Sequence, residues 1–259
     1  MLARELKGER INKTRHRNAL LPILKNRSEG SIEFKHQNIS AVLARLGQPF
    51  ISGYKPRFNY QQTLYDKVLE FLNSSSNWDN LFAEFSDQEI KKANKKIDFE
   101  KLKVEPPEPS RTDENQVNEP GIAYRPNYLE REQANMEMGR AGEFMAVEYE
   151  RWSLRKRGKD KLADAVEWVS ETQGDGFGYD IVSRNLDGTD KYIEVKTTRL
   201  SKYAPFYFTH NELSVSRKQA NRYYVYRFFN FERRTNFFAL RGSFDSICTF
   251  HPTAYKGII

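Results

Sequence analysis

Two short apolar runs joined by an Asp-Gly pair constrain the fold of this chain most strongly. Residues 179–184 and 192–197 are rich in Tyr, Ile and Val, which favour β-strands, and Asp187-Gly188 between them is typical of a hairpin turn. We therefore expect two antiparallel strands. Side chains alternate along a strand, so Glu194 and Lys196 should project from one face and Val195 from the other.

The length of the hairpin loop decides where Asp180, in the first run, is placed. A three-residue loop over 186–188 puts Asp180 opposite Glu194, and one over 187–189 puts it opposite Lys196. Either loop brings the three side chains onto one face. A two-residue loop, 187–188, would turn Asp180 to the face of Val195, so their convergence requires an odd loop or a bulge.

The surrounding sequence predicts an α/β domain. A helical segment comes first, strand-like runs and a second helix follow, and Thr209 with Glu212 three residues later matches a helix-capping box. We expect the order αβββαββ with a mixed sheet. The expected elements are a helix over 133–152, strands over 166–170, 179–184 and 192–197, a helix from about 209, and strands over 223–231 and 236–241.

The front of the chain predicts a small all-helical domain. Apolar residues recur at helical spacing over 32–46 and over 64–72, and Leu20, Ile23 and Leu24 are expected to close a bundle with them. Between these helices and the α/β part, apolar residues become sparse and prolines accumulate. The predicted organisation is a basic helical domain over 1–85, a linker over 86–127 and an α/β domain over 128–259.

The charge, the cysteine count and the lack of long apolar runs limit which partners, disulfides and cellular locations are expected. The chain has 42 Lys and Arg against 35 Asp and Glu, a formal net charge of +7, and the excess lies in the first 85 residues, which favours polyanionic partners. The single cysteine excludes an internal disulfide and any cysteine-rich zinc cluster. With no apolar run of membrane-spanning length and no signal peptide, we expect a cytoplasmic protein without membrane association.

The candidate site suggests metal chemistry. Two carboxylates converging on one point need a cation, and oxygen ligands suit Mg²⁺ or Mn²⁺ better than zinc. The ion would act on a phosphate, while Lys196 positions a water or steadies the developing negative charge. The alternative is an exposed strand with a Glu-x-Lys pair and an unrelated Asp.

The D…ExK arrangement resembles the PD-(D/E)xK superfamily of restriction-endonuclease-like nucleases. The longer string also resembles the NO VEIN C-terminal-type domain; it consists of Gly139-Arg140-Ala141-Gly142-Glu143, Gly174-Asp175-Gly176-Phe177-Gly178-Tyr179-Asp180-Ile181 and Ile193-Glu194-Val195-Lys196-Thr197-Thr198. This resemblance covers about the last 125 residues and implies catalytic positions at Asp180, Glu194 and Lys196. It adds Glu143 as an accessory acid, and the metal ligands expected are Asp180, Glu194 and Val195.

Other residues are candidates for binding nucleic acid. Residues 54–60 interleave aromatic rings with cations, which suits stacking on bases while neutralising phosphates, and we single out Tyr54, Lys55 and Arg57. The alternative is a rigid connection with its rings buried. Gln219 and Tyr223 have the Q-x-x-x-Y spacing of some superfamily members, although a helix end explains them equally well.

The sequence therefore predicts a metal-dependent DNA endonuclease, and the resemblance points to restriction or phage defence. Two alternatives stay open. One is a catalytically silent nuclease-fold module that binds DNA or acts as a scaffold in a defence complex, and the other is an RNA-processing nuclease. Besides DNA, other defence-system subunits are candidate partners, and a homodimer would make double-strand cutting easier.

Overall fold

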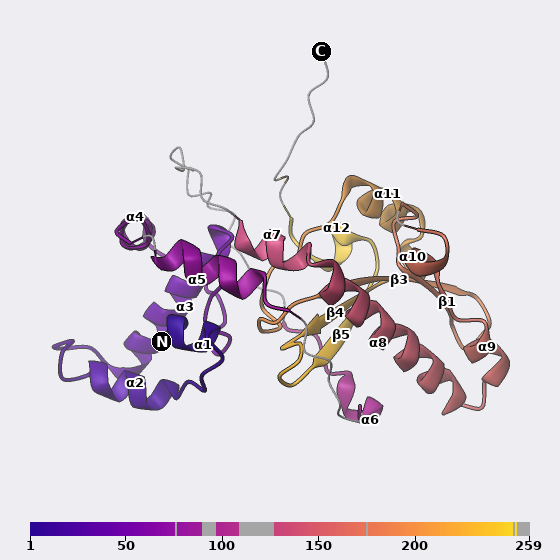
Figure 1. Cartoon of the computed structure of the whole chain (residues 1–259), viewed down its shortest axis with the longest axis horizontal. Coiled ribbons are helices and arrows are strands. Elements are labelled where there is room, and N and C mark those ends of the chain that lie inside the picture. Colours follow the sequence, from indigo (N-terminus) through magenta and orange to yellow (C-terminus); the bar gives the residue numbers. More distant parts are fainter. Residues whose placement is uncertain (76, 90–96, 109–126, 175, 251, 253–259) are drawn as a thin grey trace, which may run out of the picture.

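The computed structural model describes residues 1–75, 77–89, 97–108, 127–174, 176–250 and 252. Its C-terminal part is built on a five-stranded sheet of order β1-β2-β3-β4-β5 (Figure 1). The strands are β1 (Glu167–Trp168), β2 (Ile181–Arg184), β3 (Asp190–Thr197), β4 (Tyr223–Phe229) and β5 (Asn236–Arg241). Neighbouring strands are antiparallel except β3 and β4, which are parallel. The predicted α/β class, mixed sheet and αβββαββ order are confirmed.

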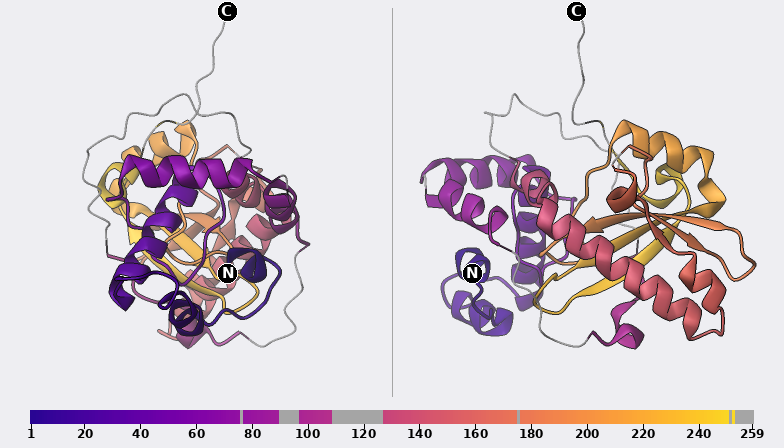
Figure 2. Two further views of the ribbon diagram at one scale, coloured as in Figure 1. Left: turned by 90° about the vertical axis from the view of Figure 1, so that its left-hand side faces the viewer. Right: turned by 45° about the vertical axis from the view of Figure 1, so that its right-hand side comes forward.

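Helices cover both faces of this sheet (Figure 2). The long helix α8 (Met136–Arg155) crosses one face and continues into the short α9 (Asp160–Asp164). On the other face lies α11 (His210–Lys218), which with the 3₁₀ turn η1 (Ala220–Arg222) forms the crossover that parallel strands require. Two further short helices are α10 (Val169–Thr172), directly after β1, and α12 (Phe244–Ile247).

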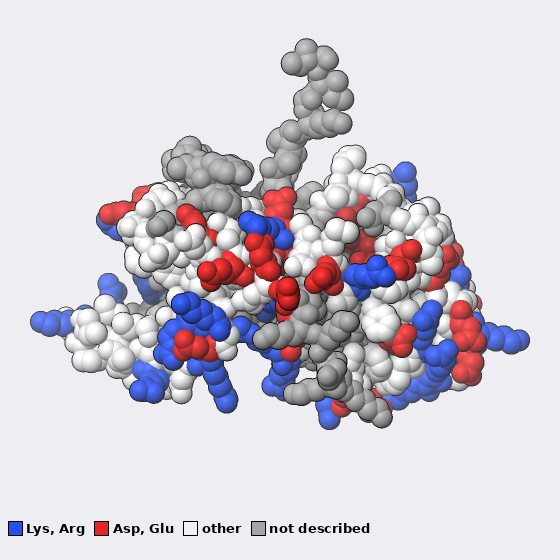
Figure 3. Space-filling view, viewed as in Figure 1, with Lys and Arg blue, Asp and Glu red and all other residues white. Residues whose placement is uncertain are grey.

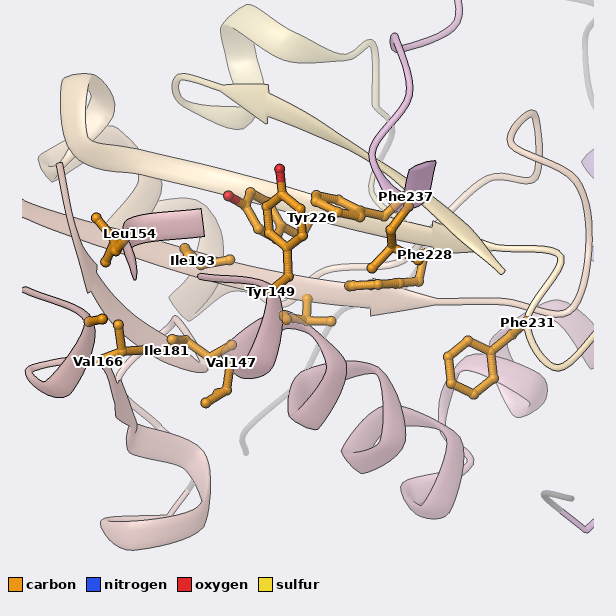
Figure 4. Close-up of a cluster of buried hydrophobic side chains, with 14 of the residues drawn as sticks. Val147, Tyr149, Leu154, Val166, Ile181, Ile193, Tyr226, Phe228, Phe231 and Phe237 are labelled. Carbon is orange, nitrogen blue, oxygen red and sulfur yellow. The ribbon is translucent and has the colours of Figure 1, made fainter. Parts of the chain in front are cut away.

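The main core lies between α8 and the sheet, and a cluster of aromatic residues lies within it (Figure 4). Tyr149 of α8 meets Phe237 of β5 edge to face, with ring centroids 4.7 Å apart, and Phe237 in turn contacts Tyr226 and Phe228 of β4. The predicted alternation explains this packing, because Tyr226 and Phe228 face α8 while Tyr223 and Val225 face α11 and α12.

The N-terminal part is helical, as predicted. Its elements are α1 (Leu2–Leu6), α2 (Lys13–Leu20), α3 (Glu29–Arg45), α4 (Gln62–Asn73) and α5 (Asn77–Ser86). The apolar positions that indicated helices over 32–46 and 64–72 are largely inside its core. That core also contains residues from beyond the helices, namely Tyr128 and Leu129 of α7 (Tyr128–Gln133), and Leu200 and Ala204 in the segment after β3.

Two expectations for the front half are wrong. Ile23 and Leu24 do not close the bundle, because α2 ends at Leu20 and their side chains are 72% and 40% exposed. Part of the predicted linker packs on the sheet: α6 (Phe99–Leu102) buries Leu102 in the main core, and Val104 donates a hydrogen bond to the Phe237 carbonyl. Residues 90–96 and 109–126 of that linker lie outside the described residues.

The surface carries both charges. In the view of Figure 3, Lys and Arg are prominent around the N-terminal helices and near the C-terminal end of α8, and Asp and Glu are prominent across the middle, with some acidic residues among the cations. No helix in the described part of the chain has the length and apolar character needed to cross a membrane.

Candidate functional site

The β2–β3 hairpin fixes the position of Asp180. Its register pairs Ile181 with Ile193 and Arg184 with Asp190, and Asn185 donates its N–H to the Thr189 carbonyl. The loop is therefore the three-residue turn over 186–188. Extended by one residue, this register would set Asp180 opposite Glu194, as the first of the two odd-loop alternatives predicts.

The regular ladder ends at Asp180. Its N–H donates to the Ile193 carbonyl at 2.9 Å, one residue out of register, and its carboxylate Oδ2 accepts the Val195 N–H at 2.7 Å. This departure from the ladder draws the carboxylate toward the backbone of β3, between Glu194 and Lys196. The glycine-rich segment before it acts as a turn: Gly178 has φ +76°, and its carbonyl accepts the Tyr223 hydroxyl.

Lys196 lies between two carboxylates. Its Nζ is 2.7 Å from Glu194 Oε1 and 2.8 Å from Glu212 Oε2 on α11. Glu194 and Lys196 are nearly inaccessible, with 4% and 7% of their surfaces exposed. Asp180 is more accessible than either, because it is only partly buried.

Glu143 approaches the site from α8. Its Oε2 accepts hydrogen bonds from Trp168 Nε1 at 2.7 Å and from Ser170 Oγ at 2.5 Å. The preceding residue, Gly142, lets α8 approach β3 closely, because a Cβ there would come within 2.0 Å of Thr197 Oγ1. Arg140, three residues earlier on α8, forms an ion pair with Glu171.

The electrostatics of the site are dominated by crowded acids. Burial and the carboxylates of Glu194 and Glu143 raise the pKa of Asp180 well above its ordinary value. Burial, opposed by Lys196 and reinforced by Glu212 and Glu143, raises the pKa of Glu194 from 4.5 to about 7. The pKa of Lys196 is raised despite its burial, because Glu194, Glu212 and Asp180 favour the ammonium form. Lys196 alone therefore does not keep all of these crowded acids ionised.

The predicted nucleic-acid residues are not part of this group. The ring of Tyr54 is 1% exposed and stacks on His36 with centroids 4.9 Å apart, so Tyr54 is a packing residue and not a platform for bases. Arg57 is exposed, with its guanidinium over the Phe34 ring at 4.6 Å, and Lys55 lies over Tyr203 at 5.4 Å. Both cations are on the helical part of the chain.

Gln219 likewise lies apart from the acids. It caps the C-terminal end of α11, and its side-chain oxygen accepts a hydrogen bond from Arg222. Gln219 is seven residues beyond Glu212, about 10 Å along the helix. The partner in its predicted motif, Tyr223, does support the site, through its bond to the Gly178 carbonyl.

Sequence reasoning missed Glu212 as a site residue. The capping box explained it, and Thr209 does accept the Glu212 N–H at 3.2 Å. The Glu212 carboxylate, however, binds Lys196. The signal that could have identified it is topological: in the predicted order, the crossover helix is the next element after the strand that carries Lys196.

Comparison with known proteins identifies one domain. Residues 142–240 match the family model described as "Protein NO VEIN, C-terminal", so the chain carries this domain over that range. The matched range runs from Gly142, at the α8–β3 contact, to the last residues of β5, and it includes Asp180, Glu194, Lys196 and Glu212. No curated protein and no solved structure matches the chain.

Proposed function

We propose that this chain, which carries a NO VEIN C-terminal domain, is a Mg²⁺- or Mn²⁺-dependent endonuclease that hydrolyses phosphodiester bonds in DNA. The observation that carries the proposal is the convergence of Asp180, Glu194 and Lys196 at the start of β2 and along β3. This is the D…ExK arrangement of the PD-(D/E)xK nucleases, a superfamily to which we assign the domain as part of the proposal.

The donor set suits a hard divalent cation. Asp180 and Glu194 supply carboxylate oxygens, and Val195, whose side chain has no donor atom, would contribute its backbone carbonyl. Across the described residues no three His, Cys, Asp or Glu side chains are placed to hold a metal together. Mg²⁺ does not require such a cage, because it keeps several of its waters and is commonly bound by one or two carboxylates. A cation here would favour the ionised forms of Asp180 and Glu194, whose pKa values are raised without one.

The side chains have distinct roles in this reaction. A bound cation supplies Lewis-acid stabilisation of the negative charge on the phosphate. Lys196 orients the attacking water or stabilises the developing charge through its ammonium group. Glu143, held by Trp168 and Ser170, is the accessory acid at the more exposed side of the site.

DNA is the proposed substrate because of the basic helical part. Residues 1–85 carry the excess of cations, and Lys55 and Arg57 are the residues we assign to phosphate contacts. We place the activity in the cytoplasm, in restriction or phage defence, with other defence subunits or a second copy of this chain as partners. RNA is the alternative substrate.

One observation favours a different function, that of a catalytically silent nuclease-fold module. Lys196 forms ion pairs with both Glu194 and Glu212, and the described residues include no group of three His, Cys, Asp or Glu side chains placed to bind a metal. Such a module would bind DNA or a defence subunit without cutting. Metal titration separates the two functions: a nuclease is stabilised thermally by Mg²⁺ or Mn²⁺ in a way that depends on Asp180 and Glu194, and a silent module is not.

The direct test is a cleavage assay. Purified full-length chain is incubated in Mg²⁺ or Mn²⁺ with labelled double-stranded DNA, modified phage DNA, single-stranded DNA and RNA in parallel. We expect DNA cleavage that is lost in EDTA and falls by two orders of magnitude or more, roughly, in Glu194→Gln, because the variant lacks a ligand to the cation.

Glu150→Gln is the matched control. Glu150 of α8 is 4% exposed, as Glu194 is. It pairs with Lys191, which is on β3 like Lys196 but faces α8. Its variant should be less stable yet should retain cleavage at temperatures where it is folded. Cleavage of DNA by Glu194→Gln at the wild-type rate would refute the assignment, and cleavage of RNA alone would replace DNA as the substrate.

A further inference from the structure

Glu212 is the member of the site for which neither the D…ExK pattern nor helix capping provides a role. Only 14% of its side chain is exposed, and Oε2 lies 2.8 Å from Lys196 Nζ. The cap of α11 uses the backbone N–H of Glu212 and not its carboxylate. The side chain is therefore free to serve the site.

The surroundings fix Glu212 against the strand that carries Lys196. Asn211 donates to the Gly176 carbonyl at 2.7 Å, and Val215 packs so closely on Gly178 that a Cβ there would lie 2.8 Å from Val215 Cγ2. The first turn of α11 is thus attached to the segment that leads into Asp180. One set of contacts therefore holds the segments that carry Glu212 and Asp180, both of which act electrostatically on Lys196.

Lys196 needs a partner in every state of the site. Its ammonium group is buried, and a buried charge that loses its partner is strongly destabilised. In this structure Glu194 and Glu212 share that function. A divalent cation on Glu194 would compete with Lys196 for the same carboxylate and would repel the ammonium group.

We propose that Glu212 is the positioning residue for Lys196: it retains the ammonium group when a divalent cation takes over the Glu194 carboxylate. This inference rests on the proposed function, because it assumes a cation at Asp180 and Glu194. It adds that Glu212 makes the site ready for the cation by giving Lys196 an alternative partner. Without Glu212, Lys196 would depend on Glu194 alone and would oppose cation binding.

A double-mutant cycle read out by Mn²⁺ affinity tests this role. Mn²⁺ binding to the full-length chain, without DNA, is measured by isothermal titration calorimetry in wild type, Glu212→Gln, Lys196→Met and the double variant, with Asp180→Asn as the check that Mn²⁺ binds at this site. We expect Glu212→Gln to weaken Mn²⁺ binding on the order of tenfold, as for coupled groups in one network. In the Lys196→Met background the same change should have a much smaller effect, because the competing ammonium group is gone.

Glu143→Gln is the control for charge alone. Glu143 acts electrostatically on Asp180 and Glu194 but makes its hydrogen bonds with Trp168 and Ser170. Its effect on Mn²⁺ affinity should be equal with and without Lys196. Glu212→Asp keeps the charge but shortens the reach to Lys196, so it should also bind Mn²⁺ more weakly than wild type. Circular dichroism shows whether Glu212→Gln folds. If it does not, Glu212→Asp takes its place in the test.

The outcomes separate this inference from the proposed function. If Mn²⁺ binds and the binding depends on Asp180, but Glu212→Gln has the same effect in both backgrounds, Glu212 is only a distant charge and the inference is overturned. If wild type shows no Mn²⁺ binding that depends on Asp180, the metal site itself is refuted, and the role of Glu212 with it.

Discussion

Two buried lysines of β3 show how similar residues acquire different roles. Lys191 and Lys196 lie on opposite faces of the strand, and each pairs with a buried glutamate, Glu150 and Glu194. Burial raises the pKa of Glu150, but Lys191, Ser183 and Tyr226 more than offset it and lower the pKa below its ordinary value. Glu194 has acids as further neighbours, and its pKa is raised. The Glu150–Lys191 pair, whose charges are satisfied, stabilises the fold. The Glu194–Lys196 pair, which has further acids around it, suits a cation.

This contrast predicts opposite pH dependences of stability. Because the pKa of Glu194 is raised from 4.5 to about 7 in the folded chain, the folded state binds a proton that the unfolded state releases between these values. The contribution of Glu194 to stability is therefore fully present below pH 4.5 and is lost as the pH rises to about 7. Urea unfolding in EDTA should show that Glu194→Gln flattens this loss.

For Glu150 the sign is reversed. Its pKa is lowered by folding, so its contribution is present above the ordinary value and is lost as the pH falls through the folded value. Glu150→Gln should therefore reduce the loss of stability on the acid side and leave the slope that Glu194 causes intact. Equal pH profiles for both variants would show that the two glutamates do not differ as described.

At the residue scale, the sequence predicted that Asp180, Glu194 and Lys196 lie together, but it did not predict that Glu212 lies beside them. Alternation along β3 and an odd hairpin loop sufficed to bring Asp180, Glu194 and Lys196 together. Tyr54 was misjudged as a candidate base platform because the alternation of rings and cations does not reveal that His36, eighteen residues earlier, covers the ring. Glu212 was missed because a local pattern already explained it.

At the scale of elements, the contact between α8 and β3 determines how close Glu143 comes to the strand. The contact depends on Gly142, where an added Cβ would lie 2.0 Å from Thr197 Oγ1. The predicted helix and strands were correct because their apolar patterns are long and regular. The two-residue strand β1 and the one-turn helix α10 that follows it were predicted as a single strand, because so short a stretch has no resolvable period.

Two glycines of α8 provide a matched test of that contact. Gly142→Ala should lower the free energy of unfolding by roughly 1–3 kcal/mol, since α8 must shift away from β3. Gly139→Ala, whose Cβ would meet only Glu143 Oε1 at 3.9 Å among neighbouring atoms, should raise it by roughly 0.5–1 kcal/mol through helix propensity. Chemical denaturation of both variants measures this, and equal stability would show that α8 does not approach β3 so closely.

At the scale of the whole molecule, the two parts of the chain share a core. Residues 128–129 of α7 and Leu200 and Ala204 after β3 are buried with apolar residues of the N-terminal helices. Arg199 adds a polar link, since its Nη2 donates to the Gln88 carbonyl at 2.6 Å and its Nε pairs with Glu232. The sequence predicted two domains joined by a linker, but packing between segments so far apart leaves no local pattern.

The basic helical part provides the prediction for DNA binding. Lys55→Ala and Arg57→Ala should each weaken binding of the full-length chain to DNA about equally for different sequences. Each should also reduce the slope of log K against log salt by about 0.9, as expected for one lost phosphate contact. Fluorescence anisotropy at several salt concentrations measures both quantities.

Lys67→Ala is the control for charge, because Lys67 is exposed on α4 and pairs with Glu70. It should leave the salt slope almost unchanged. If all three variants bind like wild type, the DNA contacts lie elsewhere on the molecule and the role proposed for residues 55–57 is wrong.

The account as a whole depends on a divalent cation held by Asp180 and Glu194 beside Lys196. The most direct measurement compares wild type with Asp180→Asn, a change of charge at nearly constant shape, in Mn²⁺-dependent cleavage of labelled DNA. We predict cleavage by wild type and none above background by the variant. DNA cleavage by both proteins at the same rate, or by neither at any Mn²⁺ concentration with any of the DNA substrates, would contradict the central claim.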